Sequence, residues 1–348
     1  MTLTELFGIE LPIVQAPMAG VQDSALAIAV SNAGGLGSLP CAMLAPADMQ
    51  RELTGIRSQT TRPFNVNFFC HEDPAPDAGR EAAWIDALRP YFDELGLDAS
   101  AAALNAGARR PFDRDMADVI EPFRPPVVSF HFGLPAPDLL ARVKGWGSKI
   151  VSSATTVDEA RWLEARGVDA IVAQGLEAGG HRGHFLSGDL QAQAGTFALT
   201  PQIARAVRLP VIAAGGIADA AGVSAALSLG AAAAQVGTSY LLCDEATTGP
   251  LHRAALARGS AAVTAIANVF TGRPARGIVN RLMRDLGAIS PLVPPFPLAA
   301  GAVLALRREA ERRGRDDFSP MWAGQNLSGC RPVSASVLTR ELTATGGR

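Results

Sequence analysis

The chain has 348 residues, of which 48% are hydrophobic and 18% are charged, with 31 basic side chains against 33 acidic ones. A chain of this length and apolar content can bury a sizeable core, which excludes a disordered or fibrous protein. The formal net charge of −2 provides no positive field for nucleic acid or an anionic membrane, so we expect neither as a partner. The length allows two domains or one large α/β barrel.

Neither a metal centre nor an export signal is expected. The four cysteines are scattered and form no CxxC pair, which argues against a zinc site or a disulfide framework. The first residues, MTLTELFGIELP, lack the basic and apolar regions of a secretory signal. The weakly polar stretches 220–242 and 291–306 are too polar or too short to favour a membrane span. We expect a cytoplasmic protein, and a homodimer is compatible with the sequence.

Eight short apolar segments alternate with helix-like segments along the first 240 residues. Most of them are continuously apolar, as expected for strands of a parallel sheet that is covered on both faces. The expected strands begin at Pro12, Leu36, Phe64, Val127, Lys149, Ala170, Pro210 and Ala233. This alternation is typical of an α/β protein with a (β/α)8 TIM barrel, and a doubly wound open sheet is the alternative.

Capping residues predict where individual helices begin and end. Thr156, with Glu159 three residues later, predicts a helix that ends at Gly167. Asp219 and Gly230 bracket another helix in the same way.

Two stretches exceed what a minimal barrel needs. We expect a barrel over residues 1–239 with a helical insertion at about 71–126. Residues 240–330 are expected to form a small, mainly helical substrate-binding subdomain, which acts as a lid over the barrel. Residues 331–348 are expected to contain a terminal helix that packs back on the barrel.

Glycines follow the seventh and eighth expected strands, at the end of the barrel where active sites lie. Gly215 and Gly216 follow the seventh strand, and the run Gln235–Thr238 ends the eighth. Glycine lets backbone N–H groups approach an anion closely, and barrels commonly bind phosphate at these two loops. The hydroxyl group of Thr238 is a further donor. We predict a phosphate site here, and the alternative is that the glycines only form tight turns.

Small and neutral polar side chains at other strand ends suit a flat heteroaromatic ring. Met18 follows the first strand, where it can contact the edge of such a ring. Asn67 and Gln174 are neutral amides at the ends of the third and sixth strands. Amides suit the carbonyl and imide edge of an isoalloxazine better than they suit a metal ion.

The polar run after the sixth strand contains the best catalytic candidate. There Gly179 and Gly180 precede His181, whose ordinary pKa lies near the operating pH of an acid–base catalyst. The alternative is a structural histidine bonded to backbone. His131, at the end of the fourth strand, is a second candidate. Glu177 could orient His181 or could be a solvated carboxylate.

These strand-end segments together resemble the nitronate monooxygenase family, formerly called 2-nitropropane dioxygenases. The resemblance runs from about Leu11 to Asn326. It rests on QAPMAG, GGLGSL, PFNVNFF, SFHFG, QGLEAGGHRG, AAGGI, QVGTSYLLCDE, FTGRPARGIVN and WAGQN. SFHFG and WAGQN look most like the class I branch, whose members oxidise propionate 3-nitronate.

The resemblance implies a TIM barrel that binds FMN and oxidises alkyl nitronates with O2, without a metal, to a carbonyl compound and nitrite. The implied FMN-binding residues are Met18, Asn67, Gln174, Gly179, Gly180, Gly215, Gly216, Gln235, Val236, Gly237 and Thr238. His181 matches the family's catalytic histidine, which deprotonates a neutral nitroalkane and helps to hold the nitronate. His131 would help to line the substrate pocket.

One segment departs from the family pattern. Class I relatives can carry tyrosines and a lysine in the segment that corresponds to 294–308, where this chain has Phe296 and neither residue type. A carboxylate-binding site would then need another cation, and Arg182 and Arg276 are the candidates; otherwise a more apolar nitronate is favoured. An NAD(P)H-using enoyl or quinone reductase on the same barrel and a non-catalytic flavin-binding barrel are the alternative functions.

Overall fold

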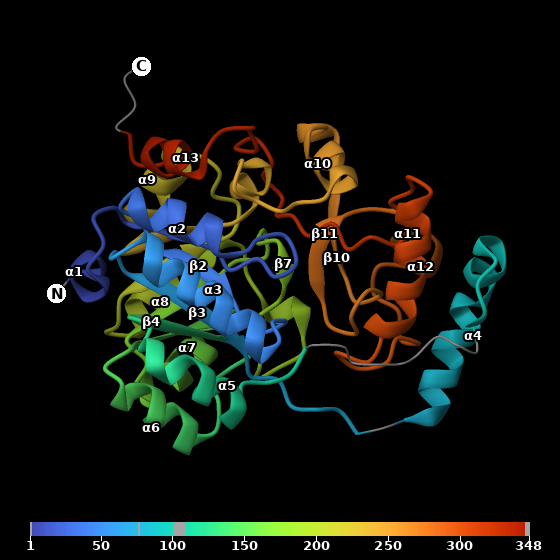
Figure 1. Ribbon diagram of the computed structural model, residues 1–348, viewed down its shortest axis with the longest axis horizontal. Helices are drawn as coiled ribbons and strands as arrows, with labels where there is room; N and C mark the ends of the chain where they lie inside the picture. The colour runs from blue at the N-terminus through green and yellow to red at the C-terminus, as the bar shows by residue number, and fades with distance from the viewer. Residues whose placement is uncertain (1, 76, 100–108, 345–348) are drawn as a thin grey trace.

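The computed structural model describes residues 2–75, 77–99 and 109–344, and these residues contain a parallel β-barrel. Its strands are β1 (Ile13–Gln15), β2 (Gly37–Pro40), β3 (Phe64–Phe69), β4 (Val127–His131), β5 (Lys149–Ala154), β6 (Ala170–Gln174), β8 (Val211–Ala214) and β9 (Ala233–Val236). They pair in the order β1-β9-β8-β6-β5-β4-β3-β2, and a parallel bridge between Val14 and Leu36 closes the sheet. The predicted (β/α)8 barrel is therefore confirmed, and the open sheet is excluded (Figure 1).

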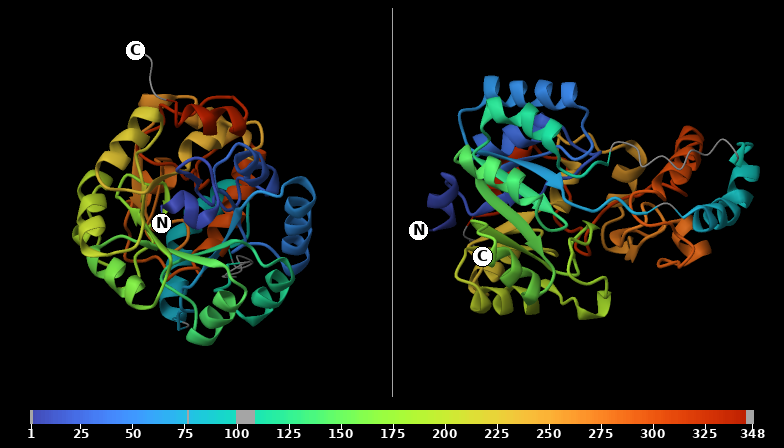
Figure 2. Two further views of the ribbon diagram at one scale, coloured as in Figure 1. Left: turned by 90° about the vertical axis from the view of Figure 1, so that its left-hand side faces the viewer. Right: turned by 90° about the horizontal axis from the view of Figure 1, so that it is seen from below.

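Helices surround the barrel, as the view along it shows (Figure 2). They are α2 (Ser24–Asn32), α3 (Pro46–Gln59), α5 (Arg114–Ile120), α6 (Pro137–Gly145), α7 (Val157–Ala165), α8 (Thr196–Ala206) and α9 (Ala220–Ser228). The expected caps are present: the side chain of Thr156 accepts a hydrogen bond from the backbone N–H of Glu159, and that of Asp219 accepts one from Gly222.

The short helix α1 (Leu3–Phe7) lies at the end of the barrel where the strands begin, near the middle of the left-hand view in Figure 2. Leu3, Leu6 and Phe7 belong to one buried cluster with side chains from the barrel strands, including Val14 and Val127. Because this end is filled by packed apolar side chains, the opposite end, where the strands terminate, is left for a ligand.

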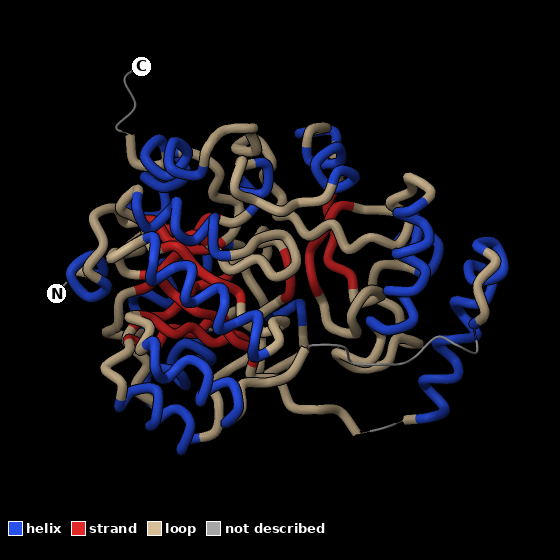
Figure 3. Tube along the Cα trace, in the orientation of Figure 1, coloured by secondary structure: helices blue, strands red, loops and turns tan. Residues whose placement is uncertain are grey.

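A three-stranded antiparallel sheet joins the barrel to a second unit, and Figure 3 shows its strands beside those of the barrel. It consists of β10 (Thr264–Ala267), β11 (Ala275–Ile278) and the two-residue strand β7 (Gly180–His181). In the ladder between β11 and β7, Ala275 is paired with His181. The loop after β6 is therefore fastened to both units, and His181 lies where they meet.

The second unit also contains α4 (Ala78–Leu95), α11 (Arg281–Leu286) and α12 (Ala300–Arg312). Trp84 and Phe92 of α4 share a buried core with Val303 and Phe318. The expected insertion at 71–126 is therefore divided, because α4 packs in the second unit while α5 covers the barrel. The second unit, expected to be mainly helical, also holds β10 and β11. The remaining domain boundaries stay a prediction.

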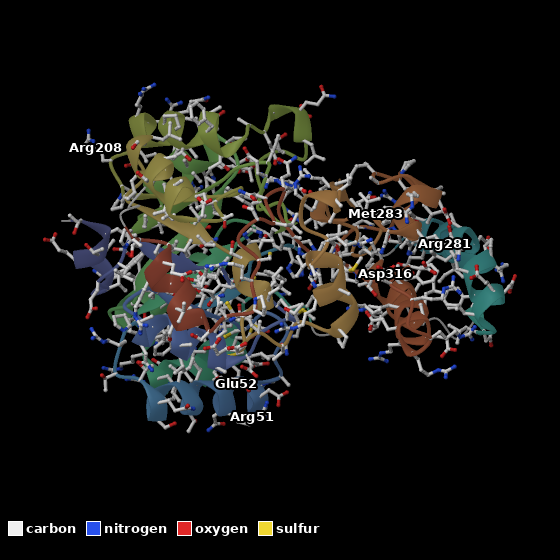
Figure 4. The ribbon with its side chains drawn as sticks, turned by 90° about the horizontal axis from the view of Figure 1, so that it is seen from above. Arg51, Glu52, Arg208, Arg281, Met283 and Asp316 are labelled. Carbon is white, nitrogen blue, oxygen red and sulfur yellow. The ribbon has the colours of Figure 1, made fainter. Side chains whose placement is uncertain are left out.

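Ion pairs at the surface connect α4 with the rest of the second unit. The guanidinium of Arg281, labelled in Figure 4, lies 2.8 Å from Glu94 of α4, and that of Arg315 lies 2.7 Å from the same carboxylate. Hydrogen bonds from these two arginines lower the pKa of Glu94 to about 2. Exposed pairs of this kind contribute little individually, so the apolar core accounts for most of the packing energy.

Two helices complete the described chain. Helix α13 (Ala335–Glu341) lies against the barrel, where Thr339 and Tyr240 share a hydrogen bond of 2.8 Å between their hydroxyl groups. Helix α10 (Pro250–Leu256) follows the barrel in the chain and carries His252. Within residues 2–75, 77–99 and 109–344, no helix is both long and apolar enough to cross a lipid bilayer.

The core contribution of α4 can be tested at Trp84, whose side chain is fully buried. We predict that Trp84→Ala lowers the free energy of unfolding by about 3–5 kcal/mol, because it removes a large apolar side chain and leaves a cavity. Phe197→Ala is the control, since Phe197 is 75% exposed and its removal should change stability by less than about 0.5 kcal/mol. Urea denaturation measures both variants, and equal effects would contradict the assignment of α4 to a packed core.

Candidate active site

A cavity of about 560 Å³ lies at the end of the barrel where the strands terminate. This volume is within the range of small-molecule and cofactor sites. Its wall includes most of the residues singled out in the sequence: Met18, Asn67, His131, Gln174, Gly179, Gly180, His181, Gly215, Gly216, Gln235, Gly237 and Thr238. Val236 and Arg182 are not among the wall residues; the side chain of Val236 is buried in the core behind the cavity.

The loop after β8 requires glycine for its shape. Gly215 and Gly216 have φ angles of +122° and +72°, which favour glycine. A Cβ atom at Gly215 would also lie 2.7 Å from the hydroxyl oxygen of Thr196. The loop therefore presents bare backbone to the cavity.

The loop after β9 adds a hydroxyl group to this part of the wall. The Oγ1 atom of Thr238 accepts a hydrogen bond of 2.9 Å from the backbone N–H of Gly324, which leaves its own hydrogen for a ligand. The charged residues of the cavity wall are Arg109, Arg307 and Glu311, and none of them belongs to the loops after β8 or β9. An anion at this end would therefore be held by backbone and hydroxyl donors.

The two predicted amides are both held by hydrogen bonds. Nδ2 of Asn67 donates to the Ser129 hydroxyl at 2.9 Å. Nε2 of Gln174 donates to the carbonyl oxygen of His181 at 2.9 Å, while its Oε1 accepts from the backbone N–H of Gly183 at 2.7 Å. Gln174 thus lines the cavity and also fixes the backbone of the histidine loop.

The ring of His181 is enclosed by apolar groups. Its centroid lies 5.2 Å from that of Phe296, 5.5 Å from that of Trp322 and 6.2 Å from that of Phe69. Burial lowers the pKa of His181 well below 6.5, and the positive charge of Arg109 lowers it further. The ring is therefore neutral near pH 7 and can act as a base.

The hydroxyl of Thr271 holds one ring nitrogen of His181. Nε2 of His181 lies 2.9 Å from Oγ1 of Thr271, whose own hydroxyl donates to the carbonyl oxygen of Arg273 at 3.4 Å. In the tautomer in which Nε2–H donates to this hydroxyl, Nδ1 keeps its lone pair and is the basic atom of the ring.

His131 lies on the cavity wall but both of its ring nitrogens are occupied by protein. Nε2 is 3.1 Å from the carbonyl oxygen of His181, to which it donates, and Nδ1 is 2.8 Å from the hydroxyl of Ser153. Burial lowers the pKa of His131 to about 3. The ring is neutral and orients the backbone of β7, which leaves no ring nitrogen free to act as a second base.

Arg182 has a different role from the predicted one. Its side chain is fully buried, and its guanidinium donates to Gln193 at 2.8 Å and to the carbonyl oxygens of Gly175 and Gln174 at 2.7 and 2.8 Å. These bonds turn it away from the cavity wall, so it cannot grip a substrate carboxylate. The sequence placed it correctly beside His181 but could not show which way the side chain points.

Arg276 and Glu177 are also structural. Nε of Arg276 donates to the carbonyl oxygen of Leu176 at 2.9 Å. One carboxylate oxygen of Glu177 accepts from the N–H and hydroxyl of Thr196 at 2.7 and 2.9 Å, so it fixes the loop below His181 and does not orient the ring. Among the described residues, no group of three or more His, Cys, Asp or Glu side chains could hold a metal ion.

The structure adds wall residues that the sequence reasoning missed: Phe69, Arg109, His252, Arg307, Glu311 and Trp322. Trp322 lies within a segment that carried the family resemblance, and that position could have signalled it. Arg109 comes from the insertion, and no local pattern of residues distinguishes it from the chain's many other arginines.

Comparison with known proteins identifies the family. The family model described as nitronate monooxygenase matches residues 1–345. The chain belongs to the nitronate monooxygenase family. It is 43% identical over 340 residues to a nitronate monooxygenase from Pseudomonas aeruginosa, and the match covers 97% of each chain.

Solved structures of similar proteins agree with this assignment. A nitroalkane oxidase from Streptomyces ansochromogenes is 38% identical, with a TM-score of 0.88, covering 98% of this chain and 96% of the other. FabK from Thermotoga maritima is 27% identical, with a TM-score of 0.72, covering 98% of this chain and 94% of the other. Family membership thus confirms the resemblance seen in the sequence.

The neutral histidines make the fold sensitive to acid. Burial lowers the pKa of all five histidines below 6.5, to about 3 at His131 and about 4 at His184 and His252. As pH falls below 6.5, the unfolded chain takes up protons that the folded protein does not. Stability then decreases by up to about 1.4 kcal/mol per pH unit for each ring.

We therefore predict that the free energy of unfolding falls as pH is lowered from 6.5 to about 4.5, above the main titration of carboxyl groups. Urea denaturation at a series of pH values measures this slope. A constant free energy of unfolding across that window would contradict the neutral, buried state of these rings.

Proposed function

We propose that this protein oxidises alkyl nitronates with O2 in the cavity at the end of the barrel, with FMN as its cofactor. Family membership and the likeness to a nitroalkane oxidase support the reaction class. The observation that carries the proposal is His181, a half-buried neutral base on the wall of a cavity that is also lined by the glycine loops after β8 and β9 and by the hydroxyl of Thr238. The products would be a carbonyl compound and nitrite.

The residues of the cavity fit FMN. The loops after β8 and β9, with Gly216, Gly237 and Thr238, would hold the phosphate through backbone and hydroxyl donors. A Cβ atom at Gly237 would lie 3.2 Å from that of Ala16 and 3.6 Å from the sulfur of Met18, so there is little room for a side chain at this point of the wall. Asn67 and Gln174 lie on the wall, where their amides suit the polar edge of the ring. When bound, FMN supplies the transfer of electrons from the nitronate to O2.

The chain's own residues prepare the substrate. Nδ1 of His181 would take the proton from the carbon beside the nitro group of a neutral nitroalkane, and Thr271 would hold the ring in the required tautomer. Phe69, Phe296 and Trp322 surround that ring and exclude water from it. A substrate that is already a nitronate would need binding at this position but no proton transfer.

An NAD(P)H-using enoyl or quinone reductase on the same barrel, the alternative that the sequence left open, stays the second candidate function. The higher identity to the nitroalkane oxidase and to the nitronate monooxygenase favours nitronate oxidation.

Replacement of His181 tests its role as the base. We predict that His181→Asn lowers kcat/KM for a neutral nitroalkane by about 10²- to 10⁴-fold, because general base catalysis is lost. The same variant should bind FMN normally, as judged from its visible spectrum, and should lose less activity with a preformed nitronate. Oxygen uptake measures both reactions, and unchanged turnover of the neutral nitroalkane would exclude His181 as the base.

The lowered pKa of His181 predicts an unusual pH profile. A base must be unprotonated, and burial keeps the ring neutral to well below pH 6.5. We therefore expect kcat/KM for a neutral nitroalkane to show no loss as the pH falls through 6.5. An inflection near 6.5 that disappears in His181→Asn would show that the ring is solvated and only weakly perturbed.

A further inference from the structure

One positive charge on the cavity wall has no counter-charge in the described protein. Of the three charged residues in that wall, Arg307 and Glu311 are paired with each other, with Nε and Oε1 2.6 Å apart. No ion pair to Arg109 occurs within residues 2–75, 77–99 and 109–344. The sequence 100–108 contains no aspartate or glutamate. The cavity therefore carries one unbalanced positive charge, at Arg109.

Arg109 and His181 both line the wall of this cavity. The backbone N–H of Phe112 donates to the carbonyl oxygen of Phe69 at 2.8 Å, which fastens this segment to the end of β3. Phe69 in turn has its ring centroid 6.2 Å from that of His181. The segment that carries Arg109 is thus attached to a strand end whose Phe69 packs near the ring of His181. In agreement, Arg109 has the largest effect of any charged group on the pKa of His181.

Arg109 is half-buried, and a charge that is withdrawn from water without a partner is unfavourable unless a ligand supplies the opposite charge. Burial lowers the pKa of Arg109, and Arg307 lowers it further, but a guanidinium remains protonated in proteins. The histidines of the wall, His131, His181 and His252, all have lowered pKa values and are neutral near pH 7. They therefore cannot provide positive charge for an anionic ligand.

We propose that Arg109 binds the anionic nitronate group of the substrate and is its charge partner in this cavity. The planar guanidinium presents paired N–H donors, which match the two oxygens of a planar nitronate. His181 and Arg109 then have separate roles. The neutral ring of His181 takes the proton, and the guanidinium of Arg109 stabilises the negative charge that proton removal creates on the nitronate. This inference rests on the proposed function, because it assigns a residue to the substrate of that reaction.

The test compares Arg109→Gln and Arg109→Lys with Arg110→Gln in the FMN-containing protein. Arg110 is the matched control, because it is exposed and pairs with Asp113 and Asp115 on the surface. Its replacement by Gln removes the same charge from the protein. We predict that Arg109→Gln lowers kcat/KM for a preformed nitronate by about 10- to 100-fold, mostly through KM. Arg109→Lys should recover part of the loss, and Arg110→Gln should match the unmodified protein.

A binding measurement separates this inference from the proposed reaction. Nitrate is a planar anion that resembles the nitronate group, and its binding can be followed by the change in flavin absorbance. We expect the Kd of nitrate to rise at least about 10-fold in Arg109→Gln and to stay unchanged in Arg110→Gln. If the protein fails to oxidise nitronates but the Kd of nitrate changes only in Arg109→Gln, the proposed reaction is wrong and the assignment of an anion site at Arg109 is retained.

The ring of His181 provides a second readout that does not depend on turnover. Because a nearby positive charge lowers the pKa of a histidine, Arg109→Gln should raise the pKa of His181, as measured by NMR, while Arg110→Gln should not. If Arg109→Gln leaves the KM for nitronate, the Kd for nitrate and the pKa of His181 unchanged, the assignment of Arg109 is overturned.

Discussion

The site depends on the hydrogen bonds that converge on the carbonyl oxygen of His181. Gln174, at the end of β6, donates to this oxygen at 2.9 Å, and His131, at the end of β4, lies 3.1 Å from it. Two strands of the barrel thus fix one backbone atom, and the pairing of β7 with β11 fixes the same residue from the second unit. The ring is placed by backbone constraints on three sides.

The position of the loop after β6 between the barrel and the second unit explains why many polar side chains near the cavity have structural roles. Arg182 and Gln174 each satisfy backbone groups of the loop after β6, and Glu177 of this loop accepts from the backbone N–H of Thr196 at the start of α8. This loop runs between the barrel and the second unit, where it cannot form regular secondary structure along its length. Its backbone N–H and C=O groups therefore need side-chain partners. The chemistry is left to the few groups of the loop that reach the cavity.

The electrostatics of the cavity depend on titratable side chains that are withdrawn from water and have no partner of opposite charge. Each histidine on the wall is neutral because its surroundings disfavour the charged form. A neutral base and a separate unpaired cation suit a substrate that is neutral before proton removal and anionic afterwards. A charged histidine could hold the anion but could not accept the proton.

Much of the fold could be predicted from the sequence because its signals are local. Continuous apolar runs gave the eight strands, and Thr156 and Asp219 gave correct helix starts. The loops after β8 and β9 were singled out because glycines follow both strands, at the end of the barrel where backbone N–H groups can approach a ligand. The packing of α4 with the second unit was missed, since it depends on contacts between distant segments. The direction of Arg182 and the exposure of Arg109 to the cavity were missed for the same reason: neither is encoded in neighbouring residues.

Anaerobic mixing of the purified, FMN-containing protein with a preformed nitronate, followed by visible absorbance, tests the central claim most directly. The account predicts that the nitronate rapidly diminishes the oxidised-flavin absorbance, that O2 restores it, and that NADH in place of the nitronate leaves it unchanged on that timescale. A protein that cannot bind FMN, or one whose flavin responds to NADH but not to nitronate, would contradict the account.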